Sequence, residues 1–198
     1  MLSFKTKKYL LVLFGLILTG CKDKLPIIEN LNENKYSFVN HNNEPRNFPE
    51  FVKGNITVVG YIFTNCPDIC PLTTNNMRLI QEKIKKENIS GIKFVSISFD
   101  PMQDSPKTLR KFAEVRDLDL SNWNFLVGTK QTTDSLMKKV GILAVIGDST
   151  VFKSGKKIYY YVHTDRIQLM DKDGAIRKNY RGSSINVDEI VNDIKSLN

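Results

Sequence analysis

The segment NITVVGYIFTNCPDICPLTTNNMRLIQEKIKKEN, residues 55–88, changes its pattern of apolar side chains at a pair of cysteines. Residues 55–63 form a dense run of β-branched and aromatic side chains, which predicts a buried central strand. From about residue 71 to 88, apolar side chains recur at helical spacing with Lys and Glu between them, which predicts an amphipathic helix. We therefore expect Cys66 and Cys70 at the point where a strand passes into a long helix.

Predicted strands and helices alternate through the rest of the chain. In chain order we expect a short hairpin at 36–51, the strand and helix of the segment above, and a strand at 91–99. Next we expect a helix that starts at Pro106 after an N-cap at Ser105, a strand at 123–128 and a helix at 129–141. Two hairpins follow at 151–163 and 165–182, with turns at Ser154–Gly155 and Asp173–Gly174, and then a helix at 187–197. This order favours an α/β fold, a thioredoxin-like three-layer α/β/α sandwich with a mixed central sheet and an extra β-hairpin. Sites in open α/β sheets gather at the carboxyl ends of strands, which is where the cysteine pair falls.

The composition is that of an ordinary globular domain rather than of a nucleic-acid-binding protein. The chain has 198 residues, of which 41% are hydrophobic and 25% charged, and this length suits one domain plus a short extra segment. The formal net charge is +8, but Lys5, Lys7 and Lys8 lie near the N-terminus, so +8 − 3 leaves +5 for the rest. The other basic residues are interleaved with acidic ones, so we expect a solvated surface and no nucleic-acid partner.

The N-terminus has the layout of a secretory signal, with a basic start, an apolar run over 9–18 and a small-residue end. The apolar run is too short for a membrane span, which needs about 20 residues. Leu18-Thr19-Gly20-Cys21 resembles the lipobox of bacterial lipoproteins, and this resemblance implies cleavage before Cys21 and acylation of Cys21. The alternative is an ordinary cleaved signal followed by an incidental cysteine.

The cleavage site divides the chain into three expected parts. These are a lipoprotein signal peptide over 1–20, a lipidated tether over 21–34 and a folded domain over 35–198. Under either alternative the domain works outside the cytoplasm, where disulfides can persist. We expect a membrane-anchored lipoprotein at the periplasmic face or cell envelope.

Without Cys21, only Cys66 and Cys70 remain. A disulfide across so short a loop stabilises little, because the entropic gain grows with loop length, so we expect the pair to serve chemistry. If the helix begins near Pro67, both cysteines lie on one face of its first turn. The positive end of the helix dipole would then favour the thiolate, which is both a nucleophile and a soft metal ligand. The pair alone leaves redox chemistry and metal binding open.

The chain has two histidines, and one of them falls where it can reach the cysteines. His163 stands directly before the 165–182 hairpin, in a loop that lies beside the cysteine motif in a sheet of this kind. Two thiolates and one imidazole form a three-donor soft set that suits copper, as Cu(I), Cu(II) or both. A structural zinc site would need a fourth ligand. His41 could supply it only if the early hairpin folded over the site, which we do not expect. The alternative for His163 is a packed or solvated histidine without a metal.

The prolines argue against a thiol–disulfide oxidoreductase. Enzymes of that class with this fold carry a cis-proline before the strand that faces their cysteines. No proline of this chain lies beyond Pro106, and VHTD stands at 162–165 instead. This departure favours a site that binds something other than a disulfide-containing peptide.

Three motifs in the right order resemble the SCO/SenC family of copper-binding, thioredoxin-like assembly proteins, over roughly residues 35–198. YIFTNCPDICPLTTNNM resembles the family's cysteine signature, VSISFDPMQDSPKTLRKFA its Ser–x–Asp–Pro element, and VHTDRIQLMDKDG its histidine motif. The resemblance implies copper ligation by Cys66, Cys70 and His163. It also implies a role in assembling the copper A centre of cytochrome c oxidase, with subunit II of the oxidase or another copper-site protein as partner.

The sequence departs from the family pattern at two positions. Many members have Asp directly before the histidine, where this chain has Val162, and Phe99 stands where a smaller apolar residue is usual. Neither departure removes a ligand, but both affect the surroundings of His163. Asp68 and Asp100 are candidates for the outer shell of the site, and the alternative is that they serve as cap and turn residues.

The leading hypothesis is a lipid-anchored copper metallochaperone, which is not an enzyme in the turnover sense. A thiol–disulfide reductase or peroxidase-like thiol protein is the enzymatic alternative, and a redox sensor that acts on partner cysteines is the third. Copper must bind the reduced pair in the first hypothesis, so metal loading would depend on the disulfide state of the site.

Overall fold

The computed structural model describes residues 25–151 and 157–198. The expected signal peptide, Cys21 and the turn expected at Ser154–Gly155 lie outside the described residues.

A mixed eight-stranded sheet forms the centre of the molecule, in the order β1-β10-β9-β4-β5-β6-β2-β3. Its strands are β1 (Glu29–Asn30), β2 (Tyr36–Asn40), β3 (Pro45–Phe48), β4 (Ile56–Ile62), β5 (Ile92–Ser98), β6 (Trp123–Gly128), β9 (Ile167–Met170) and β10 (Ala175–Tyr180). β4, β5 and β6 are parallel, and the other neighbours pair antiparallel. Every residue of β4 is buried, as expected for a central strand.

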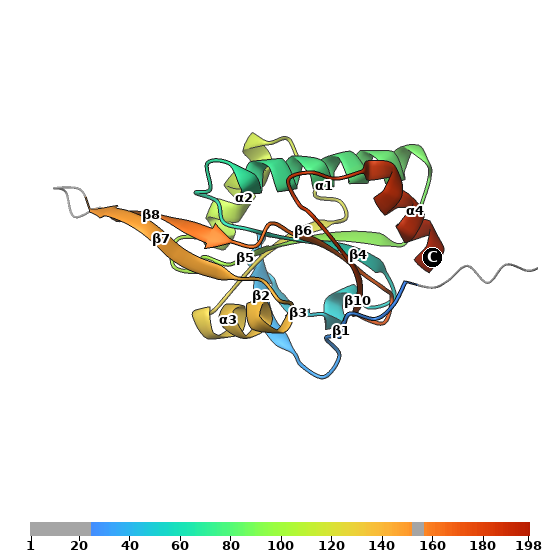
Figure 1. Ribbon diagram of the computed structural model, residues 1–198, viewed down its shortest axis with the longest axis horizontal. Helices are drawn as coiled ribbons and strands as arrows, with labels where there is room; N and C mark the ends of the chain where they lie inside the picture. Colours follow the sequence, from blue (N-terminus) through green and yellow to red (C-terminus); the bar gives the residue numbers. More distant parts are fainter. Residues whose placement is uncertain (1–24, 152–156) are drawn as a thin grey trace, which may run out of the picture.

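Helices cover both faces of this sheet. They are α1 (Ile69–Lys86), α2 (Pro106–Val115), α3 (Lys130–Lys139) and α4 (Val187–Leu197), with a short 3₁₀ turn, η1 (Glu50–Val52). α1, α2 and α4 lie on one face and α3 lies on the other (Figure 1). Ser105 caps α2 as predicted, because its side chain accepts the Thr108 backbone N–H. These layers confirm the predicted three-layer α/β/α sandwich.

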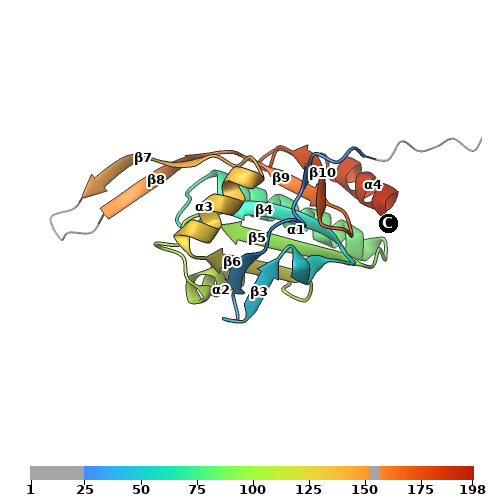
Figure 2. The same cartoon turned by 90° about the horizontal axis from the view of Figure 1, so that it is seen from below.

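The extra hairpin forms a separate two-stranded sheet of β7 (Ala144–Val151) and β8 (Lys157–His163). It projects beyond the body of the molecule in both views (Figures 1 and 2). Its first strand begins at Ala144, earlier than the predicted start at residue 151. The side chains from Val145 to Thr150 are exposed, so their sequence has no burial pattern that would mark a strand.

The folded part extends further toward the N-terminus than predicted. Residues 29–30, within the expected tether, form β1 and pair with Ala175 and Ile176 of β10. Leu31 is fully buried, and the Arg177 guanidinium donates to the Leu25 carbonyl at 2.7 Å. A single buried leucine among polar residues gives no periodicity, which explains why the sequence indicated a tether here.

Gly60 of β4 allows α1 to approach the sheet closely. A Cβ atom at Gly60 would lie 2.5 Å from the Met77 Sδ atom and 3.7 Å from Thr73 Cγ2, both on α1. Because Met77 is fully buried, it has little space into which to move. The helix that carries Cys70 therefore depends on the missing side chain at this position.

We expect Gly60→Ala to lower the free energy of unfolding by about 1–3 kcal/mol, because the added methyl group overpacks the interface between α1 and β4. Urea denaturation of the reduced domain measures the change. Gly147→Ala is the matched control, since its Cβ would meet no atom closer than 3.4 Å, and we expect it to stay within about 1 kcal/mol of the native protein. Equal stability of the two variants would contradict the close contact at Gly60.

Candidate metal centre

Three side chains from two distant parts of the chain meet beyond the carboxyl end of β4. Cys66 lies in the loop after β4, Cys70 lies in the first turn of α1, and His163 is the last residue of β8. The Cys70 Sγ and His163 Nε2 atoms are 3.9 Å apart, and the donor atoms of all three residues lie within 4.8 Å of one another. Both cysteines are free thiols. The structure thus brings together the three residues that the sequence singled out.

The two cysteines do not share a helix face, because the helix does not begin near Pro67, which was the condition for a shared face. α1 begins at Ile69, so only Cys70 is helical. The residue before a proline is disfavoured in the α region, which keeps Cys66 outside the helix. The Cys66 Sγ atom instead accepts the Cys70 backbone N–H at 3.3 Å.

The two thiols differ in acidity. The hydrogen bond with the Cys70 thiol lowers the pKa of Cys66; burial opposes this, and His163 and the backbone N–H groups lower it further. The hydrogen bond with Cys66 raises the pKa of Cys70, and the burial of Cys70 adds to the effect. Burial is the largest single effect on His163 and lowers its pKa, but its hydrogen bonds with Cys66 and the Thr164 carbonyl, together with the nearby negative charges, outweigh burial and the net pKa is raised. Cys66 is therefore the thiolate of the pair.

The imidazole of His163 presents its Nε2 atom to the sulfurs. Its Nδ1 atom lies 3.1 Å from the Thr164 carbonyl oxygen. A carbonyl oxygen can only accept a hydrogen bond, so Nδ1 carries a proton and donates it. Nε2 is then the nitrogen that remains for a metal ion.

The spacing and chemistry of the three donors fit a soft metal ion. For zinc, a first-row ion, metal–sulfur and metal–nitrogen distances are about 2.3 and 2.0 Å, so two such donors up to ~4.3 Å apart can contact the same ion. The separation of 3.9 Å between Cys70 Sγ and His163 Nε2 is within this limit. Thiolate and imidazole are ligands that copper accepts, and three donors are fewer than a closed structural zinc site uses.

Aromatic rings pack around His163. The ring centroids of Phe99 and His163 are 5.0 Å apart, and those of Phe63 and His163 are 6.2 Å apart. Tyr161 packs against both phenylalanines. Phe99, which the sequence marked as a departure, is therefore a wall of the site rather than an incidental substitution.

Comparison with known proteins places the chain in a family. The sequence model of the SCO1/SenC family matches residues 28–198. The chain belongs to the SCO1/SenC family. A SCO1 protein homolog of Bacillus subtilis is 33% identical to it over 186 residues, which cover 93% of this chain and 92% of the relative.

Solved structures of SCO1/SenC proteins share this fold and confirm the predicted fold class. A SCO1/SenC family lipoprotein from Bacillus anthracis is 30% identical, with a TM-score of 0.69 over 83% of this chain and 93% of that chain. BsSco, described as a member of the Sco family of cytochrome c oxidase assembly proteins, is 31% identical, with a TM-score of 0.68 over 86% of this chain and 96% of that chain. ScoI of Bradyrhizobium japonicum, solved with copper bound, is 22% identical, with a TM-score of 0.68 over 83% and 98%.

The second histidine of this SCO1/SenC chain lies elsewhere in the fold. His41 is buried, and its Nδ1 atom accepts the Phe125 backbone N–H at 3.2 Å. It is not part of the Cys66, Cys70 and His163 group, as the sequence led us to expect. In the parts of the chain that the structure describes, no helix has both the length and the apolar character that a membrane crossing requires.

The two aspartates proposed for the outer shell have different surroundings. Asp68 occupies the N-cap position of α1, but its exposed carboxylate makes no capping hydrogen bond. Asp100 is buried, and its two carboxylate oxygens accept the Tyr159 hydroxyl at 2.9 and 3.0 Å. Burial raises the pKa of Asp100 despite these bonds. Asp100 therefore supports β8, the strand that ends at His163, rather than His163 itself.

Asp104 is a supporting residue that the sequence reasoning missed. Its buried carboxylate accepts the Thr64 backbone N–H at 3.2 Å, the Thr64 hydroxyl and the Ser98 hydroxyl at 2.6 Å. These bonds hold the loop two residues before Cys66. The signal was present, because Asp104 lies in the same Ser–x–Asp–Pro element as Asp100, but a sequence alone does not tell which of two nearby aspartates faces inward.

We expect iodoacetamide to alkylate Cys66 before Cys70 in the reduced domain. The hydrogen bond with the Cys70 thiol lowers the pKa of Cys66 to about 4, so its thiolate persists as the pH falls from 8 to 6 and its alkylation rate changes little. A free cysteine with a pKa near 8.5 would lose roughly a hundredfold in thiolate over the same range. Tandem mass spectrometry of the peptide that contains both residues identifies the modified sulfur. Faster reaction at Cys70 would show that Cys70, not Cys66, is the thiolate of the pair. A hundredfold loss of the Cys66 rate between pH 8 and 6 would show that its pKa is that of an ordinary cysteine.

Proposed function

We propose that this chain is a lipid-anchored copper metallochaperone on the extracytoplasmic side of a membrane, and that it delivers copper to the copper A centre of cytochrome c oxidase. Cys66, Cys70 and His163 are the proposed ligands of the cargo ion. The grouping of their donor atoms within 4.8 Å is the observation that carries the proposal. The copper bound in ScoI and the oxidase-assembly role given for the family of BsSco support it.

Delivery in this proposal is a ligand exchange in which no electron moves. The bonds from Cu(I) to the two sulfurs and to His163 Nε2 break as bonds form to donors of the acceptor. Each acceptor thiol that binds loses one proton, and each thiolate that is set free can take up one proton. Cys70 takes up its proton first, because its pKa is raised while that of Cys66 is lowered. A disulfide between the two cysteines would block loading.

Titration of the reduced domain, residues 22–198, with Cu(I) in the presence of a competing chelator tests the ligand set. We expect one copper ion per chain, and a loss of affinity of at least about tenfold for Cys66→Ser, Cys70→Ser and His163→Ala. His41→Gln is the control, because His41 is a histidine buried elsewhere, and it should leave the stoichiometry unchanged. Native affinity in His163→Ala would contradict the proposed site.

A second candidate function is reduction of a disulfide in the acceptor. The asymmetry of the pair favours it, because Cys66 is 9% exposed and Cys70 is fully buried, as in a nucleophile with a resolving partner. The Cys66 thiolate would attack the partner disulfide and release one partner thiolate. Cys70 would then lose its proton, attack the mixed disulfide and release the second, so that two electrons pass to the partner. Fast reduction of insulin without copper would favour this candidate, whereas normal oxidase activity after deletion of the gene would favour a redox sensor.

The anchor is tested separately from the copper site. We expect Cys21→Ser in the full chain to abolish labelling by radioactive palmitate and to remove the processed protein from the membrane fraction, because the acylated sulfur is lost. Cys66→Ser is the matched control and should retain both the label and the membrane association. A labelled, membrane-bound Cys21→Ser protein would overturn the lipid anchor without affecting the copper proposal.

A further inference from the structure

Exposed apolar side chains gather beside the metal centre. Eleven large hydrophobic residues are exposed in the described part of the chain, and six of them lie in the β5–α2 loop, the segment before β7, and the β7–β8 hairpin. These six are Met102, Leu143, Val145, Ile146, Tyr160 and Val162. Apolar side chains concentrated in this way mark interaction sites more often than single exposed ones do.

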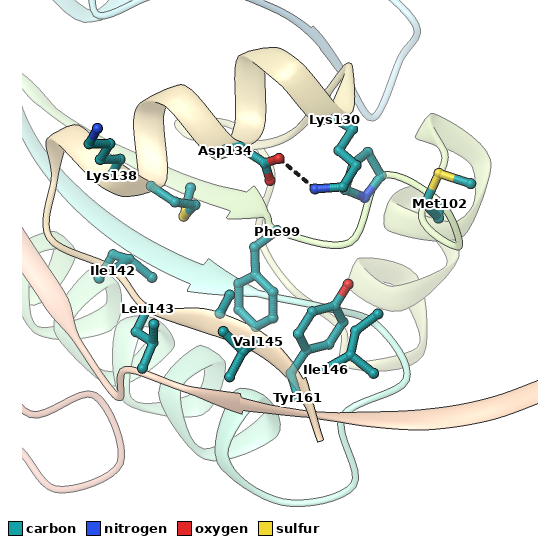
Figure 3. Close-up of a pocket in the computed structure, with 13 residues that line it drawn as sticks. Phe99, Met102, Lys130, Asp134, Lys138, Ile142, Leu143, Val145, Ile146 and Tyr161 are labelled. Atoms are coloured by element: carbon teal, nitrogen blue, oxygen red, sulfur yellow. Dashed lines mark hydrogen bonds and ion pairs between the residues drawn. The ribbon is translucent and has the colours of Figure 1, made fainter. Parts of the chain in front are cut away.

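Part of this surface forms a groove of about 540 Å³ between the hairpin and α3. Leu143, Val145 and Ile146 line one side of it, and Phe99 and Tyr161 lie between the hairpin and the end of β5 (Figure 3). Polar side chains of α3 form the other side. The volume and the mainly apolar lining are those of a binding groove rather than of a packing defect.

The groove shares a wall with the metal centre. Phe99 lines the groove, and its ring centroid is also 5.0 Å from that of His163. Tyr161 lines the groove as well and belongs to the same strand as His163. A protein seated in the groove would therefore contact Phe99 and Tyr161, the residues that separate the groove from the imidazole and support its position.

We propose that this groove is the docking surface for the protein that accepts the copper, and that its occupant is an extended segment of that protein with apolar and acidic side chains. The inference rests on the proposed function and deepens it by locating the acceptor.

Two observations determine the chemistry of the occupant. In α3, Lys130 pairs with Asp134 at 2.5 Å, whereas Lys138, the third charged residue of the groove, has no ion-pair partner among the described residues. The groove therefore has an excess of positive charge, in a chain that keeps a formal charge of +8 − 3 = +5 without Lys5, Lys7 and Lys8, and it complements an acidic segment. β7 and β8 pair only with each other among the described strands, so each has an open edge with which an extended segment can form hydrogen bonds.

The test compares two double variants that make the same chemical change at different places. Leu143→Glu with Ile146→Glu alters the groove, where these residues are 58% and 54% exposed. Ile27→Glu with Ile28→Glu is the control beside β1, remote from the hairpin (Figure 1), where the residues are 61% and 49% exposed. Both variants exchange two exposed aliphatic side chains for two carboxylates, so any effect of net charge alone is the same in both.

The probe is the reduced, metal-free soluble copper domain of cytochrome c oxidase subunit II from the same cell. We expect the groove variant to bind one Cu(I) and to release it to bathocuproine at the native rate. We also expect it to load the oxidase domain at least about tenfold more slowly, whereas the control remains within about twofold of the native rate. Lys138→Gln should weaken the dependence of the loading rate on salt.

Each other outcome overturns the inference in a recognisable way. Equal loading rates for the two double variants, with a native protein that loads the oxidase domain, contradict the groove and leave the proposed function intact. If the native protein gives copper to bathocuproine but never to the oxidase domain, the oxidase is not the acceptor. The proposal that the groove is the docking surface for this acceptor then fails as well. A native dimer that the groove variant abolishes would assign the groove to a second copy of this chain. A small molecule that co-purifies only with the native groove would assign it to that ligand.

Discussion

Antiparallel pairing of β4 with β9 is the constraint on which the metal centre depends. Gly60 of β4 lies opposite Ile167 of β9. Because the two strands run in opposite directions, the residues that follow Gly60 and those that precede Ile167 leave the sheet at the same end. The chain that continues from Gly60 leads to Cys66, and the chain that precedes Ile167 contains His163; these two segments are the two paths to the site. No covalent bond joins these paths, so the register of two buried strands sets the distance between sulfur and nitrogen, and a slip of one residue would turn the side chains to the wrong face.

A single segment between β5 and α2 supports both paths. Asp104 holds the loop before Cys66 through Thr64, and Asp100 holds β8 through Tyr159. Both carboxylates are buried, and burial raises the pKa of each, which means that their ionised forms are costly to keep inside the protein. That cost is offset by the hydrogen bonds they accept. The arrangement joins the thiol loop and the imidazole strand through one short segment, although neither aspartate touches a candidate ligand.

Sequence patterns predicted the fold class and most of the helices and strands, because burial periodicity is a local signal. They also singled out Cys66, Cys70 and His163, which the structure brings together. The cysteine spacing is a local signal, whereas His163 was chosen from its place in the expected fold. Sequence patterns failed where tertiary contacts decide the outcome. β1 and the burial of Leu31 depend on a distant strand, and the exposed strand β7 has no burial pattern to detect. The inward orientation of Asp104 follows from where β5 ends against the thiol loop. The position of Cys66 outside α1 has a local cause in Pro67, but the spacing of the two cysteines suggested that they could share a helix face.

Under the proposed function, a set of three donors rather than four suits a protein that has to release its metal ion. A site that binds its metal with a closed set of ligands holds it, whereas a site with an open coordination position lets a new ligand enter before an old one leaves. Cys70 is fully buried, Cys66 is 9% exposed and His163 is partly exposed. An incoming ligand therefore has better access to the ion from the side of Cys66 and His163 than from the side of Cys70. Phe99 packs against the imidazole and also lines the groove. An acceptor that displaced Phe99 as it docked would change the packing around the His163 ring, which supplies the single nitrogen ligand. In the proposed delivery, the exchange of copper ligands would then begin at His163 while the buried Cys70 still holds the ion.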